Sequence, residues 1–265
     1  MIARYGLDAR KSLGQHFLLD CSICERIARQ AGALDGRSVI EIGPGPGGLT
    51  RALLCTAAAS ITAVEVDPRA VAAIQELALA NTRLTVQLLD ATRVDLTELA
   101  PAPRQVVANL PYNVGTHILI RLLHQAGCWE QWTLMFQQEV AERLVARPGD
   151  EGYGRLSVLV QWLCRVELRL HLPPGVFSPP PKVSSSVVVI RPRPEQPVPE
   201  LILAMERLTA AAFGQRRKML RSSLKAVGGS ALLDEAGIVG DRRAETLEID
   251  EFEKLAHAMA VVGRG

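Results

Sequence analysis

The 265-residue chain contains no apolar run as long as the about eighteen residues that a helix needs to cross a membrane. Residues 1–11 are mixed and charged, and they lack the apolar core of a secretory signal. We therefore expect neither a membrane-spanning segment nor a secretory signal, and the predicted location is the cytoplasm.

Cysteine is sparse, and its spacing is irregular. Five thiols, an odd number, argue against a disulfide framework and fit a reducing compartment such as the cytosol. Cys21 and Cys24 form a CxxC pattern, which can bind zinc or carry redox chemistry. Because a second CxxC and a histidine pair at zinc-finger spacing are both missing, we interpret them as two thiols on a helix and expect no metal.

Short apolar runs rich in β-branched residues alternate with stretches rich in alanine and leucine. The apolar runs predict buried parallel strands at residues 38–42, 61–66, 84–89, 105–110 and 132–137. The stretches between them predict helices at residues 49–58, 70–80 and 117–125. This alternation indicates an α/β fold, a doubly wound sheet that binds ligands at the carboxyl ends of its strands.

The pattern changes after residue 150. A proline-rich segment at residues 172–182 is followed by an apolar strand at residues 187–190, and residues 191–199 contain four prolines, which is typical of a linker. Residues 200–265 then show helical periodicity that is broken at residues 228–229 and 237–240. We therefore predict one domain over residues 1–192 and a small helical domain over residues 200–265.

A glycine-rich segment, Glu41-Ile42-Gly43-Pro44-Gly45-Pro46-Gly47-Gly48, lies between the first predicted strand and the first predicted helix. Glycines here let the backbone turn tightly and approach a ligand, although a purely structural turn would use them as well. Glu65 ends the second strand and can accept hydrogen bonds from ribose hydroxyls. Asp90 ends the third strand and can accept one from an adenine amino group.

Two cofactors fit this arrangement, a dinucleotide and S-adenosylmethionine. A dinucleotide pyrophosphate needs backbone amides at the start of a helix, and Pro44 and Pro46 remove two of them. S-adenosylmethionine carries no phosphate, so the prolines favour it as the cofactor.

The fourth predicted strand ends in Asn109-Leu110-Pro111-Tyr112, where a side chain would face the reactive end of the cofactor. An adenine amine is a poor nucleophile because its lone pair is delocalised into the ring. The Asn109 side-chain oxygen and the Pro111 carbonyl can each accept one of its N–H groups, and Tyr112 can stack on the base. Methyl transfer aided by positioning is one interpretation of this motif, and a simple strand-to-loop turn is the other.

Further segments complete a resemblance that spans nearly the whole sequence. They are residues 11–18, 137–144, 153–157, 177–183 and 212–220, together with the glycine-rich segment, residues 64–67, Asp90 and residues 109–112. On these segments the chain resembles the ribosomal RNA adenine N6,N6-dimethyltransferases that act on small-subunit (16S) RNA. The resemblance implies a Rossmann-like class I S-adenosylmethionine methyltransferase sheet with a small all-helical C-terminal domain.

The resemblance also implies roles for single residues. Catalytic groups would be Asn109, Pro111, Tyr112 and Phe177. Cofactor contacts would come from His16, Leu18, Gly43, Gly45, Glu65, Asp90 and again Asn109. Many relatives have asparagine in place of His16; both side chains can donate a hydrogen bond, and the alternative for His16 is packing over the pocket. Phe177 would be a second aromatic face for a flipped base, or else a core phenylalanine before a proline turn.

Positive charge is concentrated in residues 191–225. Eight cations and three anions leave this segment an excess of five positive charges, whereas the whole chain has a net charge of +2. The cations Arg216, Arg217, Lys218 and Arg221 fall in residues 215–224, which we predict to be helical, and they can contact RNA phosphates. A solvated helix face is the alternative. Residues 200–265 are accordingly predicted to bind RNA or the ribosome.

The resemblance implies an enzyme that methylates the N6 amines of two adjacent adenosines in a 3′-terminal hairpin of 16S rRNA during small-subunit biogenesis. Its partner would be 16S rRNA in a partly assembled 30S subunit, and the chain would act as a monomer. Three alternatives remain: a large-subunit rRNA adenine dimethyltransferase of the antibiotic-resistance kind, a nucleotide-cofactor oxidoreductase, and a non-catalytic assembly factor. Binding of a nicotinamide by an oxidoreductase would not explain the motif at residues 109–112. The presence of Asn109, Tyr112 and Phe177 argues against a non-catalytic assembly factor.

Overall fold

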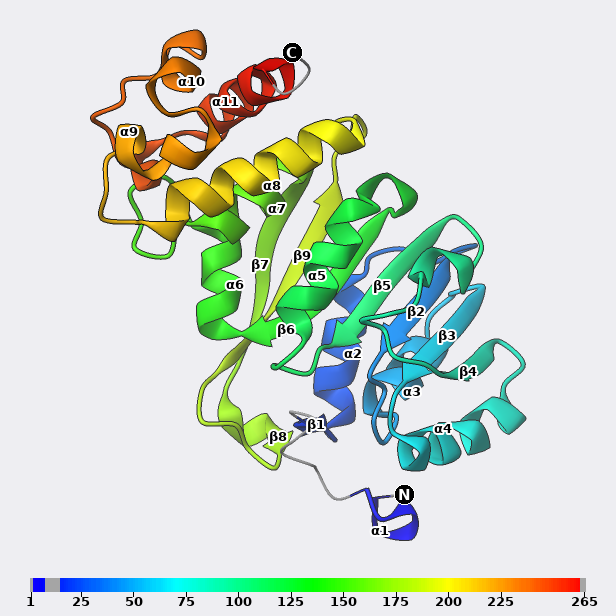
Figure 1. Cartoon of the computed structure of the whole chain (residues 1–265). Helices are drawn as coiled ribbons and strands as arrows, with labels where there is room; N and C mark the ends of the chain where they lie inside the picture. Colours follow the sequence, from blue (N-terminus) through cyan, green and yellow to red (C-terminus); the bar gives the residue numbers. More distant parts are fainter. Residues whose placement is uncertain (1, 8–14, 263–265) are drawn as a thin grey trace. The chain divides into compact units, whose positions relative to one another are not determined.

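The structure, a computed structural model, describes residues 2–7 and 15–262. Residues 11–14 of the N-terminal segment that carries the resemblance lie outside the described residues. Strands run over Phe17–Leu18 (β1), Ser38–Ile42 (β2), Ser60–Glu65 (β3), Leu84–Leu88 (β4), Arg104–Asn109 (β5), Gln131–Gln137 (β6), Cys164–Leu172 (β7), Phe177–Ser178 (β8) and Ser185–Pro192 (β9) (Figure 1). Helices run over Ile2–Tyr5 (α1), Cys21–Gln30 (α2), Gly48–Leu54 (α3), Pro68–Ala80 (α4), Gly115–His124 (α5), Gln138–Val145 (α6), Arg155–Leu163 (α7), Pro199–Gly214 (α8), Leu220–Ser223 (α9), Gly229–Glu235 (α10) and Ile249–Val262 (α11).

The main sheet has its strands in the order β4-β3-β2-β5-β6-β9-β7 (Figure 1). All neighbours from β4 to β6 are parallel, which confirms the predicted doubly wound α/β sheet. The five predicted parallel strands form with bounds that differ from the expected ones by at most one residue. The strand order reverses beside β2 and β5, and a sheet of this kind binds its ligand at that point, outside the carboxyl ends of the strands.

Strand β9 differs from these because it runs antiparallel to β6. Its first residue, Ser185, pairs with Gln137, the last residue of β6. An antiparallel strand starts where its neighbour ends. The beginning of β9 therefore lies at the carboxyl edge of the sheet, where the ligand crevice is expected.

The burial of β4 differs from the prediction. The apolar run at residues 84–89 predicts a buried strand, but β4 is an edge strand of the sheet, and its Leu88 side chain is 55% exposed. A strand at the edge has a neighbour on one side only, so part of it stays open to solvent.

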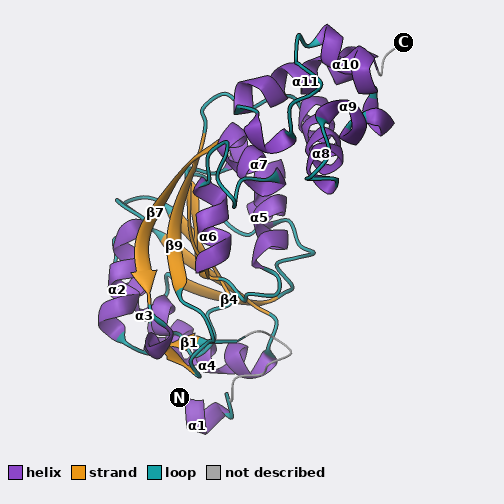
Figure 2. Cartoon of the chain, turned by 90° about the vertical axis from the view of Figure 1, so that its left-hand side faces the viewer, coloured by secondary structure: helices purple, strands orange, loops and turns teal. Residues whose placement is uncertain are grey.

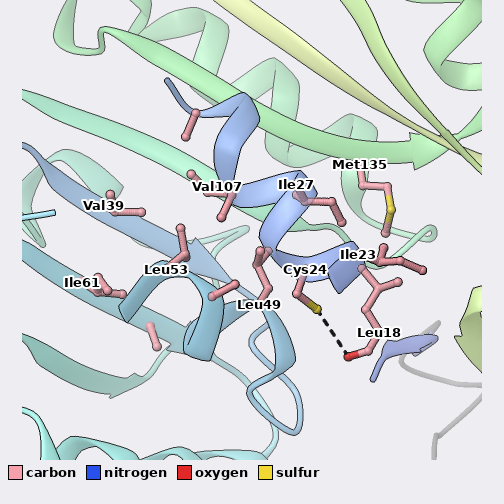
Figure 3. Close-up of a cluster of buried hydrophobic side chains, with 14 of the residues drawn as sticks. Leu18, Ile23, Cys24, Ile27, Val39, Leu49, Leu53, Ile61, Val107 and Met135 are labelled. Carbon is pink, nitrogen blue, oxygen red and sulfur yellow. Dashed lines mark hydrogen bonds between the residues drawn. The ribbon is translucent and has the colours of Figure 1, made fainter. Parts of the chain in front are cut away.

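Helices α2 and α3 cover one face of the sheet, and α5 covers the other (Figure 2). A cluster of buried apolar side chains lies between the sheet and α2 and α3 (Figure 3). It includes Val39, Ile61, Val107 and Met135 from four strands and Ile23, Ile27, Leu49 and Leu53 from the two helices. Burying one such side chain stabilises the fold by about 1.5–3 kcal/mol, so the cluster holds α3, and with it the end of the glycine-rich segment, against the sheet.

The CxxC pattern falls on α2, in agreement with the interpretation of two thiols on a helix. Cys21 is exposed, Cys24 is buried, and both are free thiols. Burial raises the pKa of Cys24 to about 12, so this thiol stays protonated. Its Sγ atom lies 3.9 Å from the Leu18 carbonyl oxygen (Figure 3).

The described residues form two compact units. One unit holds the residues up to Ala141 together with Glu167–Pro192, and the other holds Glu142–Val166 together with the residues from Arg193 onward. In the second unit the hydroxyl of buried Tyr153 donates to the Leu247 carbonyl at 2.9 Å, and its ring meets Phe213 edge to face. Residues 142–166 thus pack with helices from which residues 167–192 separate them in the sequence. The assignment of cofactor chemistry to residues 1–192 and of RNA binding to residues 200–265 stays a prediction.

The predicted helix over residues 215–224 is wrong for most of its length. Helix α8 ends at Gly214, residues 215–217 form a turn followed by a bend at Lys218, and only Leu220–Ser223 is helical. Glycine is a poor helix former, and the backbone N–H groups of Leu220 and Arg221 donate to the carbonyls of Arg242 and Gly240, which redirects the chain.

No helix in the described ranges is long and apolar enough to cross a lipid bilayer.

Candidate active site

The glycine-rich segment joins β2 to α3 through left-handed backbone conformations. Gly43, Gly45 and Gly47 have φ values of 69°, 52° and 85°, a region that favours glycine. Their N–H groups donate to three protein acceptors: the Val64 carbonyl, a Glu65 carboxylate oxygen and the Pro44 carbonyl. The two prolines of the segment have no N–H. Every backbone N–H of residues 43–47 therefore already has a protein acceptor, which disfavours a phosphate ligand.

Strand β1 lies against this segment. A Cβ atom on Gly45 would come within 2.9 Å of the Phe17 ring, and one on Gly48 would come within 2.2 Å of the Leu18 carbonyl oxygen. The sequence leaves two interpretations of the glycine-rich segment, a close approach to a ligand and a purely structural turn. At Gly45 and Gly48, the space that a Cβ atom would need is filled by β1.

A cavity of about 230 Å³ opens at the carboxyl ends of β2, β3 and β5. Its lining includes six of the predicted cofactor residues, namely His16, Gly43, Gly45, Glu65, Asp90 and Asn109. The same cavity is lined by Pro111 and Tyr112. The structure thus brings six of the seven predicted cofactor contacts and three of the four predicted catalytic residues to one place.

Two carboxylates at the cavity are held by backbone donors. The Oε1 atom of buried Glu65 accepts the N–H groups of Val66 and Asp67 at 2.8 and 2.9 Å, and burial raises the pKa of this carboxyl. Asp90 Oδ1 accepts the hydroxyl and the N–H of Thr92 at 2.6 and 2.8 Å, which lowers its pKa. These bonds orient both acids, and the second oxygen of each carboxylate, Glu65 Oε2 and Asp90 Oδ2, keeps acceptor capacity for a ligand.

A third carboxylate, Glu41, is the first residue of the glycine-rich segment, and the sequence alone assigns it no role. It lies on the same face of β2 as Val39, and its side chain is buried. Its Oε2 atom has no hydrogen-bond partner among the described residues, and burial raises its pKa to about 8. Glu41 lines a small cavity of about 20 Å³ with Gly43 and Asn109. An acidic residue inside an apolar strand is the sequence signal that could have identified it.

The side chain of Asn109, at the end of β5, is oriented by the N-terminal segment. Its Nδ2 atom donates to the His16 backbone carbonyl at 3.0 Å, which leaves Oδ1 as the acceptor end of the amide. The His16 ring stacks on Tyr112 with centroids 5.2 Å apart, and its Nδ1 lies 2.8 Å from the Pro179 carbonyl oxygen. His16 thereby connects three parts of the site.

Tyr112 and Pro111 lie in the loop between β5 and α5. The Tyr112 hydroxyl lies 2.5 Å from Ser185 Oγ at the start of β9, and partial burial raises the pKa of the tyrosine. The Pro111 carbonyl accepts the N–H groups of Val114 and Gly115 at 3.1 and 3.0 Å, so both of its lone pairs are used in the turn into α5. Ser185 carried no role in the sequence prediction.

Two predicted site residues do not line the main cavity. Phe177 and Leu18 pair with each other between β8 and β1, and both belong to the buried apolar cluster. Leu18 lines the small cavity beside Glu41. Phe177 is 4% exposed, and its role as a second face for the base stays a prediction.

The predicted RNA-binding cations lie in the turn after α8 and at the start of α9. Arg216 pairs with Glu245 at 3.2 Å, and Arg221 pairs with Asp241. Arg217 and Lys218 are exposed, and neither has an ion-pair partner among the described residues. The four cations therefore differ in how freely they can meet a phosphate.

The chemistry of the main cavity fits S-adenosylmethionine. Two carboxylates line it, and no lysine or arginine does so within the part of the chain that the structure describes. The buried carboxyl of Glu41, whose Oε2 atom has no partner among the described residues, lines a small cavity that shares Gly43 and Asn109 with the main one. Such a site suits a ligand with a sulfonium and an ammonium group, and it repels a pyrophosphate. Fold and site together define a class I methyltransferase that uses S-adenosylmethionine.

The chain belongs to the ribosomal RNA adenine dimethylase family, whose family model matches residues 6–260. It is accordingly an S-adenosylmethionine-dependent enzyme that dimethylates adenine N6 in ribosomal RNA. A relative from Gluconobacter oxydans, "Ribosomal RNA small subunit methyltransferase A", is 60% identical over 96% of this chain and 84% of its own length. A relative with the same name from Paramagnetospirillum magneticum is 53% identical over 98% of this chain and 93% of its own length.

Solved structures agree with the fold. The 23S rRNA methyltransferase ErmE is 26% identical, with a TM-score of 0.68 over 92% of this chain and 99% of its own. A dimethyladenosine transferase from Plasmodium falciparum has a TM-score of 0.75 over 91% of this chain and 96% of its own, at 24% identity. Both likenesses extend over the sheet and the helical C-terminal region.

Proposed function

We propose that this enzyme methylates the N6 amines of two adjacent adenosines in a 3′-terminal hairpin of 16S rRNA. The observation that carries the proposal is the lining of one cavity by Glu65, Asp90, Asn109 and Tyr112. The first two suit a nucleoside-bearing cofactor, and the last two suit a flat base with an amino group. The proposed chemistry is therefore the transfer of methyl groups between two ligands held side by side.

S-adenosylmethionine, when bound, supplies an electrophilic methyl group on its sulfonium sulfur. Gly43, Glu65 and Asp90 would hold it, since the acids can accept hydrogen bonds from ribose hydroxyls and from its adenine amino group. His16 and Leu18 are proposed as further contacts from the N-terminal segment. The buried carboxyl of Glu41 would face the positive charge of the cofactor.

Asn109 is proposed to orient the target amine. Because Nδ2 is bonded to the His16 carbonyl, Oδ1 is the end that would accept an N–H of the adenine. A second acceptor on the other N–H would draw the nitrogen towards a tetrahedral geometry and aim its lone pair at the methyl group. The Pro111 carbonyl could serve only by giving up one of its two backbone donors. Leu110 lines the same cavity, and its carbonyl is the neighbouring acceptor in this loop.

Tyr112 is proposed to stack on the base once the adenosine has left its helix. Stacking of a base on an aromatic ring contributes about 1–3 kcal/mol, which offsets much of the cost of flipping the base out. Phe177, the first residue of β8, would supply a second face only after leaving its buried position in the apolar cluster. This movement is part of the proposal for Phe177.

The small subunit is proposed as the substrate because relatives named for it share 50–60% identity with nearly the whole chain. The solved 23S rRNA enzyme shares 26%. We propose that a partly assembled 30S subunit in the cytoplasm is the form that a monomer of this chain binds. The exposed cations Arg217 and Lys218 would contact its phosphates.

The test is methyl transfer from labelled S-adenosylmethionine to purified, undermethylated small subunits, with large subunits in parallel and nucleoside analysis of the product. Dimethyladenosine on the small subunit alone is the expected result. Label on the large subunit alone would transfer the assignment to the resistance-type enzymes. Label on neither subunit, with the cofactor shown to bind, would contradict both assignments.

A further inference from the structure

Ser185 is a fully buried serine at the edge of the site. It is the first residue of β9, and its side chain is 0% exposed. Because β9 is antiparallel to β6, Ser185 lies at the carboxyl edge of the sheet, next to the end of β6. A buried hydroxyl needs a hydrogen-bond partner, and here the partner is the Tyr112 hydroxyl at 2.5 Å.

Tyr112 needs such an anchor because of where it lies. It belongs to neither β5 nor α5 but to the loop between them, whereas Ser185 belongs to a strand inside the sheet. Tyr112 lines the cavity, and its ring, which contacts His16, is the part of the side chain on which a base would stack. The Tyr112 hydroxyl can keep its hydrogen bond to the protein while a base stacks on the ring.

We propose that Ser185 is a positioning residue that sets the plane of the Tyr112 ring, and through it the position of the target adenine. The inference rests on the proposed stacking role of Tyr112. Methyl transfer requires the amine nitrogen to approach the methyl group in line, and a displacement of about 1 Å can cost a hundredfold in rate. A ring free to tilt at the end of a loop would spread the base over such distances.

The test is a double-mutant cycle on turnover of undermethylated small subunits. Ser185→Ala and Tyr112→Phe each remove one hydroxyl of the pair, and each is expected to lower kcat/KM for the RNA substrate about fivefold, which corresponds to about 1 kcal/mol. Tyr112→Phe keeps the ring for stacking. In the double variant the loss is expected to stay about fivefold, since the hydrogen bond is already absent. The affinity for S-adenosylhomocysteine should not change in any of the three.

Two further variants separate the hydrogen bond from packing. Ser185→Cys fills the same space with a weaker hydrogen-bonding group, so it should lose activity as Ser185→Ala does. Ser186→Ala changes the next residue on β9, whose side chain points to the opposite face, and it should keep full activity. Full activity in Ser185→Cys would instead indicate packing and overturn the proposal.

The remaining outcomes are distinct. An unchanged kcat/KM in Ser185→Ala, or losses that multiply to about twenty-fivefold in the double variant, would overturn the positioning role. Tyr112→Ala tests the proposed function itself, because it removes the stacking ring. Full turnover in Tyr112→Ala would refute the role of Tyr112, and with it that of Ser185, whereas a strong loss there leaves the cycle to decide about Ser185 alone.

Discussion

Asn109 and Tyr112 are each held at one end and offered to the cavity at the other. The amide nitrogen of Asn109 is bound to the His16 carbonyl, and the hydroxyl of Tyr112 is bound to Ser185. Each bond restricts a side chain that would otherwise rotate. The groups proposed to meet the substrate are thus arranged before it binds, which reduces the entropy that the reaction must overcome.

Asn109→Ala should lower kcat by about 10²–10³, the usual effect of removing one hydrogen-bonding group that acts on the reacting atoms. Binding of S-adenosylmethionine, measured by titration calorimetry, should weaken far less, because Glu65 and Asp90 remain. Single-turnover methyl transfer to small subunits gives the rate. A variant that keeps full turnover would refute the catalytic role of Asn109.

The buried carboxyl of Glu41 should make stability depend on pH. Burial raises its pKa from 4.5 to about 8, so between these values the unfolded chain is ionised at this residue while the folded chain still holds the proton. The folded state then binds more protons, and its stability falls as pH rises through this window, by up to about 1.4 kcal/mol per pH unit.

Glu41→Gln removes this proton and should flatten the fall in stability between pH 5 and 8, measured as the free energy of unfolding in urea without cofactor. Glu65, whose pKa burial also raises, retains part of the dependence. Glu25→Gln, at an exposed position on α2, is the matched control. An equally steep fall in Glu41→Gln would mean that Glu41 is ionised in the folded protein at neutral pH.

At the scale of elements, the glycine-rich segment and β1 pack directly against each other. The segment turns beneath β1, and its glycines leave space for Phe17 and for the Leu18 backbone. Strand β1 in turn pairs with β8, and His16 just before it reaches Asn109, Tyr112 and Pro179. The arrangement of the cofactor-site residues therefore depends on β1, a short N-terminal strand.

Gly48→Ala should disturb this arrangement, because the new Cβ would lie 2.2 Å from the Leu18 carbonyl oxygen, a backbone atom that cannot rotate away. We expect a loss of about 1–3 kcal/mol of stability together with weaker binding of S-adenosylmethionine. Thermal melting and titration calorimetry measure the two effects. Gly175→Ala is the control, since that position has open space and an ordinary φ. Wild-type behaviour of Gly48→Ala would show that β1 can shift without affecting the site.

At the scale of the whole molecule, RNA affinity should depend on which cations are free. Reversing Arg216, Arg217 and Arg221 together is expected to weaken binding of the subunit and to spare cofactor binding. Arg216 and Arg221 already pair with Glu245 and Asp241, so reversing either one also breaks an ion pair within its own unit. Arg217 and Lys218 give the cleaner test.

Arg217→Glu with Lys218→Glu should weaken binding of small subunits and make the plot of log affinity against log salt concentration shallower by about one to two. Arg26→Glu with Lys254→Glu makes the same change of charge at exposed positions on α2 and α11 and should have a smaller effect. Filter binding over a range of salt concentrations measures both pairs. Equal slopes for the two pairs would refute a specific RNA contact at residues 217–218.

Local patterns were sufficient to predict the parallel strands, the glycine-rich turn and the acids Glu65 and Asp90. These features depend on neighbours in sequence, because a buried strand is a short apolar run and its carboxyl end is followed directly by the ligand loop. The chemistry of an adenine amine gave the roles of residues 109–112, and the family resemblance added those of His16, Leu18 and Phe177. The helix over residues 215–224 failed because a contact with residues 240–242, not local propensity, directs the chain there.

The amino-acid sequence by itself determined the α/β sheet, the nature of the cofactor and the polar groups at the strand ends. Only the tertiary structure decided which atoms of Asn109 and Tyr112 are bonded within the protein and which can meet a ligand. The His16 carbonyl reaches Asn109 across 93 residues, and Ser185 reaches Tyr112 across 73. A one-dimensional pattern does not contain such pairings, because an antiparallel strand and a covering N-terminal segment bring distant residues together only when the sheet has formed.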